Sequence, residues 1–99
     1  MIVYNETYVM DPAIEQEWLD FMRNDQIPAI MKYGWFNTYK ILTILDSPNE
    51  GVTYCVQFTT DKLSNYDFFK RQHLQNFHLK HNAKFENKFV LFNTVMQEV

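Results

Sequence analysis

All three histidines of this 99-residue chain lie within one nine-residue stretch, HLQNFHLKH (73–81). A histidine ring can bind a metal through a neutral nitrogen, or it can accept and donate protons near neutral pH. Whether these histidines can bind a metal together depends on which of their rings can face one another. Eight residues on a helix span about 12 Å along its axis, so His73 and His81 cannot share a metal at nitrogen distances of about 2 Å.

His78 and His81 are three residues apart and could contact one ion, but a metal site needs a third ligand. No carboxylate stands at a matching helical position, and the chain has no HExxH motif and a single cysteine, Cys55. We therefore expect no metal and no cofactor. One cysteine also excludes an intramolecular disulfide.

Helical geometry separates the three rings by direction. At about 100° per residue, Leu74, Phe77 and His81 lie on one apolar stripe, whereas His73 and His78 flank it on opposite sides. A histidine on an apolar face can have a shifted pKa and a fixed tautomer, which suits proton transfer or anchoring of a ligand. His81 is thus the candidate catalytic residue; the alternative is a core histidine bonded to a neighbour. His73 and His78 are expected to be largely solvated.

Other side chains could complete a ligand site around His81. Trp18 lies on the apolar stripe of the first predicted helix, where core packing is the alternative role. Tyr54 and Gln57 are expected on opposite faces of one strand, and a glutamine in a central strand needs a partner for its amide, either across a dimer interface or on a ligand. The candidate ligand-binding residues are Trp18, Tyr54 and Gln57, together with His73 at the flank of the helical stripe.

Alternating apolar residues predict strands over 2–10, 36–45, 52–60 and 88–96, with turn chemistry over 46–51. Asp11 and Pro12 predict the start of a first helix. Pro28 disfavours helical geometry at Ile27 and is expected to end that helix there. A short turn over 28–33, closed by Gly34, follows. One long helix is expected from Asp61 to about Phe85, capped by Asp61 or Ser64.

This order is β-α-β-β-α-β, the ferredoxin-like α+β arrangement, in one domain over residues 1–99. Its four-stranded antiparallel sheet carries both helices on one face and leaves the other face bare. Apolar side chains occur on both faces of the predicted strands. Because a large exposed apolar face is rare on a monomer, we expect a homodimer packed sheet to sheet about a two-fold axis.

Charge and hydropathy exclude several classes of protein. The net charge of −3 argues against a nucleic-acid partner. The strand EGVTYCVQF (50–58) departs from the RNA-binding RNP1 pattern, because Glu50 stands where a basic residue belongs and the aromatic residues are out of register. No apolar run approaches about 18 residues, so no membrane span is expected. The first residues alternate like a strand without a secretory signal, so we expect a cytoplasmic protein.

The chain resembles a family of short, uncharacterised bacterial proteins described as a domain of unknown function. The likeness runs nearly end to end, through MIVYN, EWLDFM (17–22), IP (27–28), GVTYCVQF (51–58), the helix around His81 and Phe85, and FVLFNTVMQEV (89–99). It implies a dimeric α+β-barrel fold, related in shape to small cofactor-free monooxygenases, and no established activity. Three positions depart from the residues that are usual in the family. Gln26 stands in place of a histidine, Lys80 in place of an acidic residue and Asn93 in place of an arginine.

Two classes of function follow. In the first, the protein binds a small, largely apolar molecule between sheet and helices, with His81 as the polar anchor. In the second, it is a non-catalytic structural or protein-interaction dimer without a ligand pocket, and its aromatic residues form the core.

Overall fold

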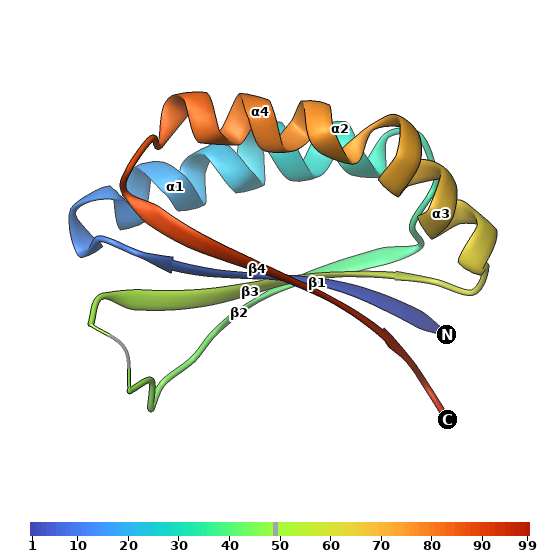
Figure 1. Cartoon of the computed structure of the whole chain (residues 1–99), viewed down its shortest axis with the longest axis horizontal. Coiled ribbons are helices and arrows are strands. Elements are labelled where there is room, and N and C mark those ends of the chain that lie inside the picture. Colours follow the sequence, from blue (N-terminus) through green and yellow to red (C-terminus); the bar gives the residue numbers. More distant parts are fainter. Residues whose placement is uncertain (49) are drawn as a thin grey trace.

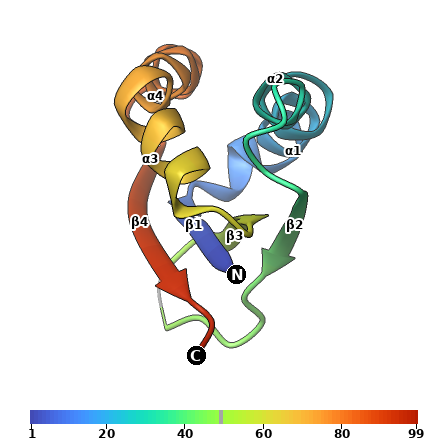
Figure 2. The same cartoon turned by 90° about the vertical axis from the view of Figure 1, so that its right-hand side faces the viewer.

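A computed structural model describes residues 1–48 and 50–99. It shows one antiparallel sheet with all of its helices packed on one face (Figure 1). The strands are β1 (Ile2–Met10), β2 (Thr38–Thr43), β3 (Val52–Thr60) and β4 (Phe89–Gln97), in the spatial order β2-β3-β1-β4. Figure 2 shows α3 and α4 above the β4 side of the sheet, and α1 and α2 above the β2 side. The predicted α+β, ferredoxin-like class is confirmed.

The sequence predicts that the first helical segment ends at Ile27, but in the structure the segment continues past this residue. Asp11 accepts a hydrogen bond from the Ala13 N–H and opens a 3-10 turn (Pro12–Ile14), followed by α1 (Glu15–Phe21), a π-helical turn (Met22–Gln26) and α2 (Ile27–Met31). Ile27 is helical, with φ −63° and ψ −47°, and its N–H donates to the Met22 carbonyl five residues back. A wider turn removes the clash that a proline makes with the carbonyl four residues before it, so Pro28 continues the helix.

The second helical segment is two helices rather than one. α3 (Leu63–Gln72) begins after Lys62, not at Asp61 or Ser64, and α4 is Leu74–Lys84. His73 separates them with φ −131° and ψ −31°, and its ring packs 4.3 Å from the Trp35 ring centroid. The helix break thus coincides with a tertiary contact, which the local sequence does not reveal.

The hairpin between β2 and β3 is present, although β2 is shorter than the predicted 36–45. The predicted turn over 46–51 includes residue 49, which lies outside the described residues. Gly51 in this turn has φ +87°, and a Cβ there would stand 2.4 Å from the Met10 carbonyl oxygen. Only glycine fits this close approach.

The sheet alternation sets the core. Tyr4, Glu6 and Tyr8 of β1 point toward the helices, as do their cross-strand partners Phe58, Val56 and Tyr54 on β3. The opposite face carries the exposed apolar side chains of Leu42, Val90, Phe92 and Met96. Within the described residues, none of the helices is both long and apolar enough to cross a membrane.

Candidate functional site

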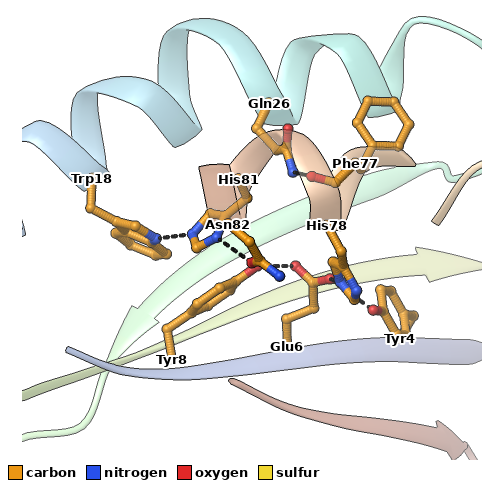
Figure 3. Close-up of polar contacts among 9 residues, drawn as sticks. All are labelled: Tyr4, Glu6, Tyr8, Trp18, Gln26, Phe77, His78, His81 and Asn82. Atoms are coloured by element: carbon orange, nitrogen blue, oxygen red, sulfur yellow. Dashed lines mark hydrogen bonds and ion pairs between the residues drawn. The ribbon is translucent and has the colours of Figure 1, made fainter. Parts of the chain in front are cut away.

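His81 lies where the helical periodicity places it, on the core side of α4. Its side chain is 0% exposed and is surrounded by the rings of Tyr8, Phe85 and Phe89. The indole N–H of Trp18 donates to His81 Nε2 over 2.9 Å, and His81 Nδ1 lies 3.2 Å from Asn82 Oδ1 (Figure 3). Both ring nitrogens therefore have partners.

These contacts fix the His81 tautomer. Because the Trp18 N–H can only donate, His81 Nε2 must carry a lone pair, and the ring proton is on Nδ1. That Nδ1–H donates to Asn82 Oδ1, and the amide nitrogen of Asn82 makes no hydrogen bond with the described residues. Burial lowers the pKa of His81, against the opposing effect of the Asn82 hydrogen bond, and so favours the neutral ring. The buried chain Trp18–His81–Asn82 thus ends in a hydrogen-bond donor on the surface of α4.

A second buried chain begins at Glu6, whose side chain is 3% exposed. The hydroxyl groups of Tyr4 and Tyr8 donate to its two oxygens over 2.7 and 2.8 Å, and His78 Nε2 lies 2.7 Å from Oε2 (Figure 3). Three donors converge on one carboxylate, which is the arrangement a buried charge requires. Burial, followed by the negative charge of Glu6, raises the pKa of both tyrosines, so they remain neutral donors.

His78 links this chain to the surface. With its Nε2–H donated to Glu6, a neutral His78 ring carries its lone pair on Nδ1. Nδ1 makes no hydrogen bond with the described residues, and it is not one of their fully buried, unpartnered polar atoms. It is therefore open to solvent. An imidazole oriented by a carboxylate, with its second nitrogen free, has the arrangement of a general base.

Both chains open into the same surface groove. This groove has a volume of about 390 Å³ and is lined by Lys70, Leu74, Gln75, His78, Leu79 and Asn82. His78 and Asn82 are one helical turn apart on α4, a spacing that places their side chains side by side. Leu74 and Leu79 supply the apolar surface. We define these six residues as the α4 groove.

The structure brings together only some of the candidate site residues. Trp18, Tyr54 and His81 meet: the Trp18 and Tyr54 rings are 5.3 Å apart, and the Tyr54 hydroxyl donates to Glu15. Gln57 lies on the other face of the sheet, opposite Asn5 and Lys40 in the strand register.

His73 lies at the helix break, in an aromatic cluster apart from the other candidates. Its ring contacts those of Tyr33, Trp35 and Phe68. Gln57 and His73 are therefore not part of the site around His81.

Sequence reasoning missed Glu6 and the contact that His78 makes with it. The signal for Glu6 was present: it lies between Tyr4 and Tyr8 on the strand face that also carries Ile2 and Met10, and an acid on such a face needs donors. His78 gives no comparable signal, since a flanking helical position does not reveal which strand residue lies beneath it. Within the described residues, no three side chains of His, Cys, Asp or Glu gather where they could hold a metal.

The departures from the family's usual residues have structural partners here. Gln26 Nε2 donates to the Phe77 carbonyl over 3.0 Å and joins the π-helical turn to α4, while Gln26 Oε1 is buried and has no partner among the described residues. Lys80 pairs with Asp25 on the surface. Asn93 is the cross-strand partner of Glu6 on β4 and is exposed.

Comparison with known proteins supports this fold over the whole chain. An ethyl tert-butyl ether d (EthD) family protein from Bacillus halodurans is 20% identical with a TM-score of 0.66, each chain covering 100% of the other. An antibiotic biosynthesis monooxygenase is 13% identical with a TM-score of 0.67, covering 100% of this chain and 99% of that one. The hydroxynitrile lyase of Passiflora edulis is 18% identical with a TM-score of 0.63, covering 99% and 95%.

At these identities the likeness establishes the fold alone. No curated protein matches the sequence. The family model described as Domain of unknown function (DUF4286) matches residues 1–99. The match confirms the resemblance to a domain of unknown function, and the chain belongs to the DUF4286 family.

Proposed function

We propose that the protein binds a small molecule with an apolar body and one polar group in the α4 groove. One observation carries this proposal: His78 and Asn82, the outer ends of two separate buried hydrogen-bond chains, line the same groove. Hydrogen-bond chains that run through a protein core are costly to build. Two of them ending side by side on one surface present a fixed acceptor and a fixed donor to a ligand.

The remaining groove residues suit such a molecule. Leu79 is 59% exposed, and Leu74, partly buried, lies beside it in the groove. Together they provide an apolar surface next to the polar pair. Lys70, from α3, adds a positive charge to the same groove. Apolar walls with a few convergent polar groups are typical of small-molecule sites.

This proposal moves the ligand contact from His81 to His78. His81 is 0% exposed and both of its nitrogens are bonded, so it cannot meet a ligand without breaking the core. It acts instead through Asn82. The similar folds include an antibiotic biosynthesis monooxygenase and a hydroxynitrile lyase, which supports small-molecule chemistry on this architecture but assigns no residue here.

Titration with 2-tetralone, an apolar ring system bearing one carbonyl group, tests binding to the groove. The NMR signals of the Leu74 and Leu79 methyl groups should shift in a saturable way. Leu79→Arg should abolish the shift at Leu74, whereas Leu63→Arg, at a similarly exposed leucine outside the groove, should leave it unchanged. Methyl signals that do not move, or that move equally in both variants, would contradict the proposal.

We also propose that the open face of the sheet pairs with a second copy of the chain. On this face Lys40 is the one charged side chain among the described strand residues, so a copy meets little like-charge repulsion. Strands spaced about 4.8 Å apart and rising about 3.3 Å per residue give a face of roughly 500 Å². That is of the same order as the ~800 Å² that each partner buries in a stable interface. Such a dimer leaves the α4 groove open.

A further inference from the structure

We infer that the α4 groove catalyses proton transfer at a carbon next to a carbonyl group, with His78 as the general base and Asn82 as the hydrogen-bond donor to the carbonyl oxygen. This inference rests on the proposed binding of a small molecule in the groove. It adds a reaction, a substrate class (small enolisable ketones or aldehydes with an apolar body) and a role for each polar group.

The base is identified by its geometry. Glu6 accepts from His78 Nε2 over 2.7 Å, which orients the ring and leaves the Nδ1 lone pair without a hydrogen bond to the described residues. When Nδ1 takes a proton, the resulting imidazolium forms an ion pair with the carboxylate that already contacts it. Tyr4 and Tyr8 donate to the two oxygens of that carboxylate and hold it in place, so little reorganisation accompanies the transfer.

The donor is fixed by the other buried chain. Trp18 sets the His81 tautomer, and the His81 Nδ1–H occupies the Asn82 oxygen. The Asn82 amide protons are then the groups left to face the groove. A preorganised donor at the place where negative charge develops stabilises the transition state. Trp18 and His81 are therefore positioning residues, which act through Asn82.

The proton transfer needs no reactant other than the carbonyl compound, His78 and water. A C–H bond of the bound carbonyl compound breaks, and its proton moves to His78 Nδ1. The electron pair forms the C=C bond of the enolate, whose negative charge rests on the oxygen that accepts from Asn82. His78 then exchanges its proton with water, and in D₂O a deuteron returns to the carbon.

The test follows 2-tetralone in D₂O by NMR, using the loss of its C1 proton signal to measure exchange while the Leu74 and Leu79 methyl signals report binding in the same sample. The protein should accelerate exchange above the rate given by free imidazole at equal concentration. His78→Gln should lower the protein-catalysed rate by roughly 100-fold, in the range found for loss of a general base, with the methyl shifts retained.

Asn82 is exposed, so Asn82→Ala should fold normally, and it should lower the exchange rate by at least about tenfold. Asn76→Ala, at another exposed asparagine of α4 outside the groove, should leave the rate unchanged. Methyl shifts without accelerated exchange, or exchange that survives His78→Gln, would overturn the catalytic inference and leave binding intact. No methyl shifts at all would overturn both.

Discussion

His78 and Asn82 lie one turn apart on α4, and each ends a buried hydrogen-bond chain that begins on a different element. The chain to His78 starts from the carboxylate of Glu6 on β1, and the chain to Asn82 starts from the indole of Trp18 on α1. Sheet and first helix thus both determine what α4 presents to solvent. This convergence is the basis for assigning function to the α4 groove.

The Trp18–His81 hydrogen bond should contribute measurably to stability. Trp18→Phe keeps an aromatic ring but leaves the buried His81 Nε2 without its donor, which should lower the free energy of unfolding by about 1–3 kcal/mol. Urea denaturation measures the change. Trp35→Phe is the matched control, because its indole N–H has no hydrogen-bond partner among the described residues and is not fully buried. Equal losses in the two variants would mean that ring packing alone is responsible.

The hydrogen bond from the Tyr4 hydroxyl group to Glu6 should contribute to the stability of the fold. Tyr4→Phe removes one of three donors to a buried carboxylate, and hydrogen bonds to charged groups contribute about 1.5–3 kcal/mol. The control is Tyr66→Phe, at a buried tyrosine in ring contact with Tyr4 but not bonded to Glu6. A loss from Tyr4→Phe no greater than that from Tyr66→Phe would show that the carboxylate does not depend on this donor.

The sequence predicts some elements of the structure more accurately than others. The alternation of apolar residues over 2–10 and 52–60 predicts β1 and β3 with their observed bounds, because each residue in these stretches can be assigned to one face of its strand. Periodicity also predicts that His81 faces inward. The predicted ends of the helices agree less well with the structure. Ile27 is helical although Pro28 follows it, because a π-helical turn accommodates the proline ring.

The site itself follows from tertiary contacts that no local pattern contains. His78 is 72 residues from Glu6 along the chain, and nothing in HLQNFHLKH indicates which strand residue lies under each ring. The break at His73 likewise coincides with a long-range contact, the packing of its ring against Trp35. Gln57 and His73 have chemically suitable side chains, but the fold separates them from the groove.

Acid should destabilise the fold through His81. Burial lowers its pKa below the usual 6.5, so as the pH falls below 6.5 the unfolded chain takes up a proton that the folded chain does not. The contribution of neutral His81 to stability is complete above pH 6.5 and declines as the pH drops toward the lower pKa of the folded state, by at most ~1.4 kcal/mol per pH unit.

Urea denaturation between pH 7 and pH 5, compared with the His81 ring signals in NMR, measures this effect. The His81 signals should remain those of a neutral ring below pH 6.5. An imidazolium spectrum for His81 at pH 6.5 in the folded protein would contradict the prediction.

The open sheet face should set the oligomeric state. Light scattering coupled to size-exclusion chromatography should give twice the 12.0 kDa chain mass at micromolar concentration. Phe92→Lys, at an exposed position of the edge strand β4 on that face, should give a folded monomer, whereas Leu63→Lys on the helical side should remain a dimer. A monomeric wild-type protein would refute the proposed sheet-to-sheet dimer.

The most direct test of the α4 groove is the ¹⁵N NMR spectrum of the histidine rings with and without 2-tetralone. Without it, His81 should show a proton on Nδ1 and a hydrogen-bonded lone pair on Nε2, and His78 should show a proton on Nε2. On addition, the His78 ring signals should shift while those of buried His81 stay nearly unchanged. A response at His81 with His78 silent would contradict the account and return the ligand to the space between sheet and helices.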